Sequence, residues 1–276
     1  MQPQLDTNIV SSFLLFVDHE IQRQGLAYSN KSGLFYPDTN RFNGVYTYTC
    51  SYKQLCNDTS ISGANVMSGV YLNGNYVTVG QSGLVSINHY DGSVNFNQQL
   101  PQNTIISGNF GVKDFSVYLS DQPDYNVLLN SKYHSNPKYA QLATGIAQSA
   151  KSMPAVILVP KDQETRPFAF AGIDDNHLKI RAMIVCENVY QRISICSILK
   201  NLRLKQMNLI YNTPFDSLGN MTGINYNYNN LQINTNYSPY ILKAKSSEIP
   251  TPKEIIDTVK QFAMVDFDIS TWGGHM

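Results

Sequence analysis

The chain has 276 residues, of which 42% are hydrophobic and only 14% are Asp, Glu, Lys or Arg. This length and apolar content allow a substantial core and exclude a disordered chain. Lys plus Arg and Asp plus Glu both number 20, so no net charge attracts nucleic acid or an anionic membrane, and nucleic-acid binding is disfavoured as the main activity.

Amide and phenol groups replace much of the usual surface charge. The sequence holds 28 Asn and 18 Tyr, whereas an ordinary soluble domain is about one quarter charged. Both side chains make directional hydrogen bonds, and Tyr adds contact area at low entropic cost. The composition therefore suits a subunit whose surface is largely covered by neighbours.

Targeting signals and cysteine spacing point to a soluble protein made in the cytoplasm. No run approaches the roughly 20 apolar residues that a membrane-spanning helix needs. The N-terminus lacks a basic region, and the apolar run 13–17 is too short for a secretory signal. The cysteines at 50, 56, 186 and 196 form no C-x-x-C pair, so we expect reduced packing thiols.

Residues 1–43 are predicted to form an N-terminal helix and a connecting loop. Apolar residues recur every four positions at Ile9, Phe13, Val17 and Ile21, and Gly25 stands where a C-terminal cap belongs. This spacing predicts a helix that docks by one face. The segment 26–43 has turn sequences and no sustained period, so we expect a loop there.

Residues 44–119 are predicted to form a small antiparallel β unit. The strongest local signal is Asn73-Gly74 between two apolar runs, which favours a type I′ hairpin turn. A second hairpin is expected where 84–87 meets 93–96. The alternating segment 112–119 predicts a further strand.

Residues 120–218 are predicted to hold an α/β core. After a region of loop or weak helix come an apolar strand at 155–159, a short run at 168–172 and a β-rich segment 178–186, with a turn expected at 174–176. Asn188 can cap a following helix that runs to residue 205. Its apolar face is expected to hold Val189, Ile193, Cys196, Leu199 and Leu202, and 207–211 to return as a strand.

Residues 219–276 are predicted to contact other subunits. The segment 219–240 holds seven Asn and four Tyr, more amides than a buried strand could satisfy, so we expect an exposed edge or loop that pairs with a partner. A linker at 245–252, a short helix at 254–262 and a strand at 265–269 would follow as a C-terminal arm. The expected inter-subunit contacts are Tyr226, Tyr228, Tyr237, Tyr240, Phe262 and Phe267.

The sequence offers no strong catalytic or metal-binding pattern. His89 with Asp91, and Asp174 and Asp175 with His177, could each begin a metal site, but Asp and Asn are also what turns use. Neither G-x-G-x-x-G nor a P-loop occurs. We therefore predict no catalytic residue, no cofactor and no metal, and a protein that is not an enzyme.

The predicted order of elements is an N-terminal helix, antiparallel strands, the 155–159 strand, a hairpin, the helix 189–205 and a closing strand. This order is similar to that of tail-terminator and related neck proteins of tailed bacteriophages, and the low charge also resembles a phage virion protein. Residues 44–119 are a larger β insertion than is usual in that family.

The resemblance implies an α+β fold and a virion structural protein that forms a homo-oligomeric ring, a hexamer, at the head–tail junction. It further implies adjacent neck, tail tube or sheath proteins as partners, no membrane contact, and nucleic acid only by passage through the ring lumen. Two other functions stay open. A tail or capsid-surface protein that binds host glycan would use exposed Tyr with Asn and Gln, and the candidates are Tyr226, Tyr228, Tyr237 and Tyr240. An enzyme would need a deep pocket with perturbed titratable groups.

Overall fold

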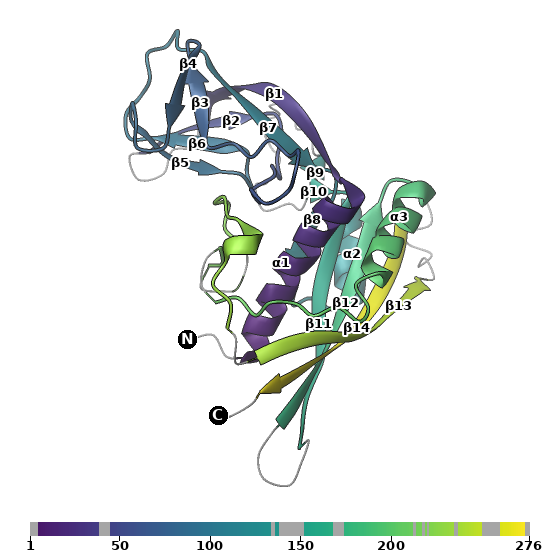
Figure 1. Ribbon diagram of the computed structural model, residues 1–276. Helices are drawn as coiled ribbons and strands as arrows, with labels where there is room; N and C mark the ends of the chain where they lie inside the picture. The colour runs from purple at the N-terminus through teal and green to yellow at the C-terminus, as the bar shows by residue number, and fades with distance from the viewer. Residues whose placement is uncertain are drawn as a thin grey trace.

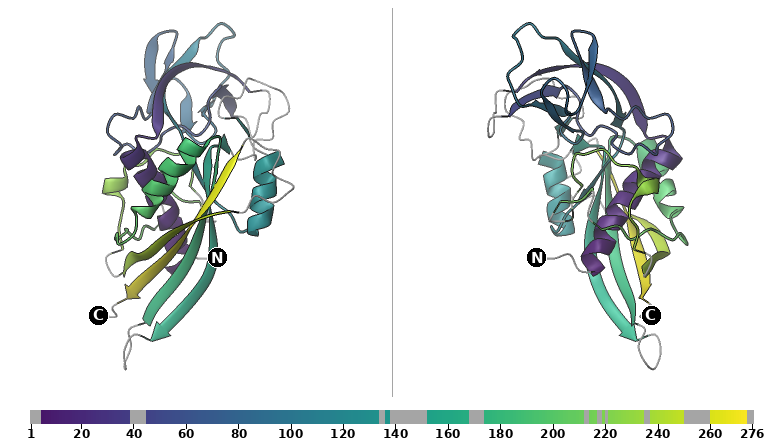
Figure 2. Two further views of the ribbon diagram at one scale, coloured as in Figure 1. Left: turned by 90° about the vertical axis from the view of Figure 1, so that its right-hand side faces the viewer. Right: turned by 60° about the vertical axis from the view of Figure 1, so that its left-hand side comes forward.

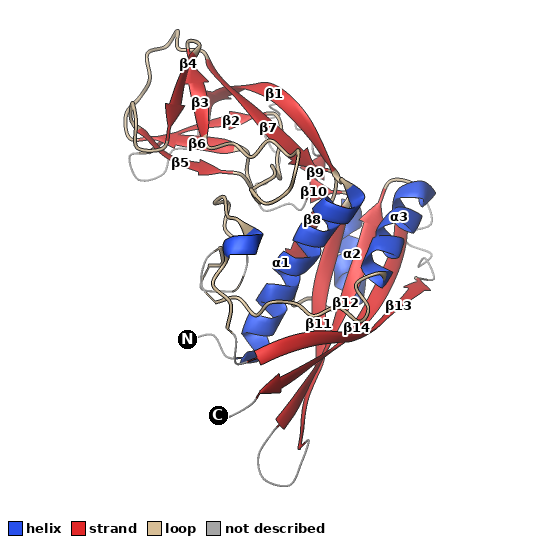
Figure 3. Ribbon diagram, in the orientation of Figure 1, coloured by secondary structure: helices blue, strands red, loops and turns tan. Residues whose placement is uncertain are grey.

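The computed structural model describes residues 5–38, 45–133, 136–137, 152–167, 174–211, 214–216, 219, 221–234, 237–249 and 260–273. A seven-stranded and a five-stranded sheet organise the chain, with the long helix α1 (Leu5–Gly25) running between them (Figure 1). Strands dominate over helices (Figure 3), so the fold is mainly β and the expected balance of α and β is wrong. The reason is that segments predicted as loop and linker pair as strands.

The element bounds are as follows. The other helices are α2 (Asp124–Tyr133), α3 (Val189–Lys200) and the short 3-10 turn η1 (Tyr228–Asn230). The seven-stranded sheet contains β1 (Tyr28–Pro37), β2 (Tyr46–Cys50), β3 (Gly69–Leu72), β4 (Asn75–Thr78), β5 (Leu84–Asn88), β6 (Ser93–Phe96) and β7 (Ile106–Lys113). The five-stranded sheet contains β8 (Ser116–Leu119), β11 (Ala155–Pro167), β12 (Asp174–Cys186), β13 (Tyr237–Glu248) and β14 (Gln261–Gly273), and β9 (Asn136–Pro137) pairs with β10 (Ser152–Met153).

The seven-stranded sheet curls until it is nearly closed. Its strand order is β4-β3-β7-β1-β2-β6-β5, so the two outer strands follow each other directly in the chain. The backbone N–H of Gly80 donates to the carbonyl of Leu84 at 2.8 Å across the turn that joins them. Apolar side chains fill its interior, among them Val70, Leu84, Val94, Phe96, Ile106 and Phe110.

Both predicted hairpins are confirmed. Strands β3 and β4 pair around Asn73 and Gly74, whose φ angles of 50° and 86° are those of a type I′ turn. Strands β5 and β6 pair across the turn that ends at Gly92.

The loop predicted at 26–43 is wrong, because β1 pairs with β7 along residues 28–35 and with β2 near its end. Most side chains of β1 are exposed, so the strand shows no hydrophobic alternation that would reveal it. The strand predicted at 112–119 is two strands: β7 ends at Lys113, and β8 begins at Ser116 in the other sheet. The division into segments at 43, 119 and 218 stays a prediction.

The five-stranded sheet has the order β13-β14-β12-β11-β8 and is covered on both faces. Helices α1 and α3 lie on one face and α2 lies on the other (Figure 2). Phe13 of α1 meets Phe267 of β14 edge to face, with ring centroids 5.0 Å apart. Four long strands, β11 to β14, carry this core, and the β11–β12 hairpin extends well past the helices (Figure 1).

The predicted C-terminal arm is wrong. Strand β14 lies inside the sheet, between β12 and β13, and its alternate residues Val265, Phe267 and Ile269 are fully buried. The first half of the linker predicted at 245–252 is part of β13, and residues 250–252 lie outside the described ranges. The helix predicted at 254–262 falls mostly outside the described residues, as does the run 168–172, and Phe262 belongs to β14.

Helices α1 and α3 are confirmed, but their buried faces differ from the prediction. Nearly the whole circumference of α1 is buried from Asn8 to Gln22, because both sheets and the segment 221–228 surround it. Asn188 caps α3 by accepting from the N–H of Gln191 at 2.8 Å. Its buried residues are Ile195 and Leu199, and the helix ends at Lys200 rather than 205.

Two smaller predictions in this region are also wrong. Residues 174–176 continue β12 instead of turning, since the hairpin pairs as far as Pro167 and Asp174. Residues 207–211 make single bridges rather than a strand, although Met207, Leu209 and Ile210 are buried as the apolar pattern requires. The four cysteines are free thiols, as expected.

Candidate functional site

A cluster of buried polar side chains joins α1 to the seven-stranded sheet. His19 Nδ1 lies 2.7 Å from Asp58 Oδ2, and the ring of Tyr228 stacks on the imidazole with centroids 4.2 Å apart. The other oxygen of Asp58 accepts from the N–H and hydroxyl of Ser60 and from the N–H of Tyr228. Burial alone would raise the pKa of Asp58, but these hydrogen bonds outweigh it and lower the pKa below its ordinary value.

A second part of the cluster is centred on Asp18, the residue before His19 in α1. Lys113, at the end of β7, donates to Asp18 Oδ2 at 2.8 Å, and Gln22 donates to the same oxygen at 2.8 Å. The hydroxyl of Tyr226 lies 3.5 Å from that oxygen, and burial raises the pKa of this phenol well above its ordinary value. Every charged group of this cluster has a partner inside the subunit. The cluster therefore stabilises the packing of α1 against the seven-stranded sheet and does not form a substrate-binding site.

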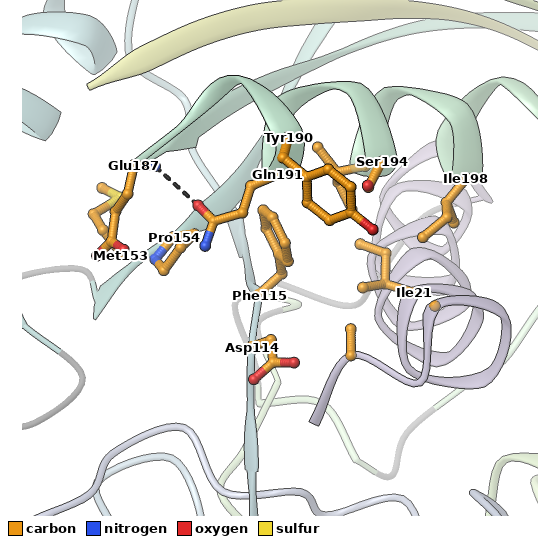
Figure 4. Close-up of a pocket in the computed structure, with 13 residues that line it drawn as sticks. Ile21, Asp114, Phe115, Met153, Pro154, Glu187, Tyr190, Gln191, Ser194 and Ile198 are labelled. Carbon is orange, nitrogen blue, oxygen red and sulfur yellow. Dashed lines mark hydrogen bonds between the residues drawn. The ribbon is translucent and has the colours of Figure 1, made fainter. Parts of the chain in front are cut away.

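A cavity of about 400 Å³ lies between the C-terminal end of α1 and one side of α3 (Figure 4). Its wall is apolar at Ile21, Phe115, Pro154, Ile195 and Ile198, and polar at Asp114, Glu187, Gln191 and Ser194. Tyr190, which is 81% exposed, stands at its margin, and the neighbouring Val189 and Ile193 are also exposed. This surface has the mixture of an apolar centre and a polar rim that is typical of a protein contact.

A groove of about 570 Å³ lies on the seven-stranded sheet. Three tyrosines, Tyr36, Tyr46 and Tyr48, line it together with Gln99 and Gln102. Tyr48 is buried and accepts from the N–H of Leu100, whereas Tyr36 is exposed. Aromatic rings beside amide groups could stack on a sugar and bond its hydroxyls.

The outermost long strands of the five-stranded sheet, β11 and β13, are each only half covered, because the outer strand β8 is short. On β11, the parallel strand β8 covers residues 155–158, and Ser120 N–H closes the pairing by donating to Leu158. On β13, the bonds of residues 204–207 end at Ile241. Within the described parts of the chain, no strand pairs with the remaining halves of β11 and β13 on their outer sides.

The face of this sheet that bears α2 carries charges in rows that alternate along the sheet. Arg181 of β12 donates two hydrogen bonds to the carboxylate of Asp266 of β14, from Nε at 2.6 Å and from Nη2 at 3.1 Å. It donates a third from Nη1 to Asp124 of α2 at 2.7 Å. Lys179, two residues earlier on β12, lies 3.2 Å from Asp162 of β11. The bonds to Asp266 and Asp124 raise the pKa of Arg181, and the bonds from Lys161 and Arg181 outweigh burial in lowering the pKa of Asp124.

The alternation continues to β13 at one side of the sheet. Lys243 lies 3.5 Å from Asp268, and Lys245 stands opposite Asp266 in the strand register. From β11 to β13 the rows therefore read acidic, basic, acidic, basic. The acidic end is exposed at Asp162 and Glu164, and the basic end is exposed at Lys243 and Lys245.

The predicted contact residues are mostly used inside the chain. Tyr226 and Tyr228 are buried against α1, and Phe262 and Phe267 are buried in the sheet. Tyr237 and Tyr240 lie on β13 and are partly exposed. The prediction that 219–240 is wholly exposed is therefore wrong, because backbone groups of Asn57, Thr59 and His89 and side chains of α1 form hydrogen bonds with it. Contact with a second subunit stays a prediction, for which the single chain offers Tyr237 and Tyr240.

The candidate metal ligands are held by other partners. Both ring nitrogens of His89 lie 2.9 Å from backbone carbonyl oxygens, of Gly223 and Met67. His177 Nε2 lies 2.7 Å from Asp175 Oδ2, which leaves a pair rather than a set of ligands. In the described ranges, no three His, Cys, Asp or Glu side chains gather closely enough to hold a metal ion.

Sequence reasoning missed the half-covered edges and the charge rows. Charged residues stand at alternate positions of 162–164, 179–181, 243–245 and 266–268 in the sequence, but only the strand register brings them together. Among the described helices, none combines the length and apolar content that crossing a membrane needs. No family model matches the chain, and no curated protein matches it significantly in sequence.

Proposed function

We propose that this protein is a non-enzymatic virion structural protein that assembles with copies of itself into a ring at the head–tail junction of a tailed phage, as a neck or tail-terminator component. The observation that carries the assembly is that β11 and β13, the outermost long strands of the five-stranded sheet, are each only half covered. Natural sheets usually shield their edges, since unpaired N–H and C=O groups invite another strand. Two such edges on opposite sides of one sheet suit the addition of a neighbour at each side.

A chain with two different binding edges joins head to tail. Such heterologous contacts close into a ring when the rotation between neighbours divides a full turn. The surface composition agrees, because Asn and Tyr replace charge over much of the chain. The exposed α3 surface beside the cavity at Tyr190 offers a further contact, for an adjacent neck, tail tube or sheath protein.

The virion setting rests on the resemblance in element order to phage neck proteins and on the low charge. In this setting the protein would be made in the host cytoplasm, would form a hexamer and would need no cofactor. Nucleic acid would meet it only by passing through the ring.

The test is the mass of the purified full chain by native mass spectrometry and light scattering. We expect one discrete species whose mass is an integer multiple of 31.0 kDa, seen as a closed ring by electron microscopy. A protein that stays at 31.0 kDa at high micromolar concentration would contradict ring assembly.

The tyrosine-lined groove on the seven-stranded sheet favours one alternative, a tail or capsid-surface protein that binds host glycan. The residues that would act are Tyr36 and Tyr46, since the earlier candidates Tyr226 and Tyr228 are buried. Binding on a glycan array that is lost in Tyr36→Ala would support this function.

A further inference from the structure

The charge rows on the α2 face end with opposite signs at the two half-covered edges. Lys243, with its side chain 75% exposed, and Lys245 mark the outer side of β13. Asp162, 71% exposed, and Glu164 mark the outer side of β11. Lys161 does not cancel them, because it turns to α2 and pairs with Asp124 at 2.6 Å.

Strand direction alternates in the same way as charge. From β13 through β14 and β12 to β11, each strand is antiparallel to the next. Four strands are an even number, so a copy placed side by side in the same orientation would set its β13 antiparallel to β11. The alternation of strand direction and the alternation of charge sign would then both continue across the junction.

The register of such a junction follows from which residues share a face. Asp162 contacts Lys179, and Glu164 stands opposite His177, so both acids lie on the α2 face with Lys179 and Arg181. Lys243 and Lys245 lie on that face too, opposite Asp268 and Asp266. In an antiparallel pair, setting Lys245 opposite Asp162 also sets Lys243 opposite Glu164, and both contacts fall outside the parts that β8 and residues 204–207 cover.

We infer that the partner of each β11 edge is the β13 edge of a second copy of this chain, with Lys245 against Asp162 and Lys243 against Glu164. This inference rests on the proposed ring and names its contact. Backbone hydrogen bonds and buried area would supply most of the affinity, while the exposed ion pairs set register and exclude the wrong edge. Neighbours must be shifted by a few residues along the strands, as strands are in any closed, twisted sheet.

The decisive experiment reverses the charge of one edge at a time. Variant A is Lys243→Glu/Lys245→Glu, so both of its edges are acidic, and variant B is Asp162→Lys/Glu164→Lys, so both are basic. Each alone would face like charges at every junction, and we expect association at about 0.1 M salt to weaken by at least about 100-fold. An equimolar mixture restores the wild-type mass, because rings of alternating A and B pair opposite charges throughout.

The matched control is Lys31→Glu/Lys200→Glu, which changes net charge as A does at exposed sites away from both edges and should assemble as wild type. Circular dichroism of each variant verifies folding. If A alone and B alone each assembled to the wild-type mass, the edge pairing would be wrong, although ring assembly itself would stand. The edge pairing would also be wrong if neither variant assembled alone and mixing them did not restore the wild-type mass. A monomeric wild type would instead remove the proposed function itself.

Cross-linking tests the register without charge. Opposed residues in antiparallel strands have Cα atoms about 4.5–5.5 Å apart, within reach of a disulfide. Asp162→Cys/Lys245→Cys should therefore give a ladder of covalent oligomers on oxidation, whereas Asp162→Cys/Lys200→Cys should not. An intact ring without a ladder would contradict the stated register.

Discussion

Glu20 shows how one side chain ties separate elements together. Its carboxylate accepts from Arg23 Nε and Nη2 at 3.0 Å, from Lys205 Nζ at 2.7 Å and from Gln24. Lys205 comes from the turn after α3, so the contact joins the two helices that share a face of the five-stranded sheet. Burial alone would raise the pKa of Glu20, but these hydrogen bonds lower it from 4.5 to about 2.

This lowered pKa predicts a loss of stability in acid. Because the folded state favours the ionised carboxylate, its contribution is present above about pH 4.5 and is lost as pH falls toward 2. We expect Glu20→Gln to lower the free energy of unfolding at pH 7 by on the order of 2 kcal/mol and to make little difference at pH 2 or below. Urea titrations at both pH values measure this. An equal loss at both would mean that packing rather than charge is responsible.

At the scale of single elements, the Asn73-Gly74 turn gives a clean test of backbone conformation. Gly74 has a φ of +86° and open space around a would-be Cβ, whereas Gly92 has a φ of +64° and would place a Cβ 1.9 Å from the carbonyl oxygen of Tyr52. Gly74→Ala should therefore cost only the left-handed strain, about 1–2 kcal/mol. Gly92→Ala adds a clash with backbone and should cost clearly more. Thermal melting compares both with the exposed Asn75→Ala, and equal losses in the two glycine variants would refute the distinction.

The elements that the sequence predicts correctly are those whose cause is local. The β3–β4 turn depends on two adjacent residues, and the start of α3 on the Asn188 side chain three residues from its partner. Strands β1 and β13 are different, because most of their side chains are exposed or half-buried, and the partner of β1, β7, is also remote in sequence. The buried face of α3 also depends on remote partners, since α1 and β14 decide which side of the helix is covered.

The candidate site follows the same rule. The Asn- and Tyr-rich composition predicts contacts with neighbouring subunits, but the hydroxyl of Tyr226 reaches Asp18 and the N–H of Tyr228 donates to Asp58, both inside the subunit. Residues 208 and 170 positions apart cannot be paired from one sequence, because nothing local records the contact. The edge charges are likewise meaningful only once β11 and β13 are known to be the outer long strands.

Over the whole molecule, α1 is the element that both sheets share. Its Phe13 side packs on the five-stranded sheet, while Asp18 and His19 reach Lys113 and Asp58 of the seven-stranded part. Segment 221–228 adds backbone bonds to 57–59 and to His89. The contact between the two parts is therefore built largely from buried polar groups that form hydrogen bonds and ion pairs with one another. Removing one partner from such a contact strongly lowers the free energy of unfolding.

Asp58 is the group whose removal should separate the two parts. It is fully buried and receives four hydrogen bonds, so Asp58→Ala would leave His19 and the N–H groups of Ser60 and Tyr228 without an acceptor.

The single Trp, Trp272, belongs to β14, so its fluorescence reports on the five-stranded sheet, whereas circular dichroism reports on both sheets. In wild type we expect the two signals to change together on urea unfolding. In Asp58→Ala, stability falls by about 3–5 kcal/mol and the circular dichroism change begins first, because the seven-stranded sheet loses its hold on α1. The exposed Asp121→Ala should behave as wild type, and coincident signals in Asp58→Ala would show that the apolar contacts alone make the two sheets unfold as one.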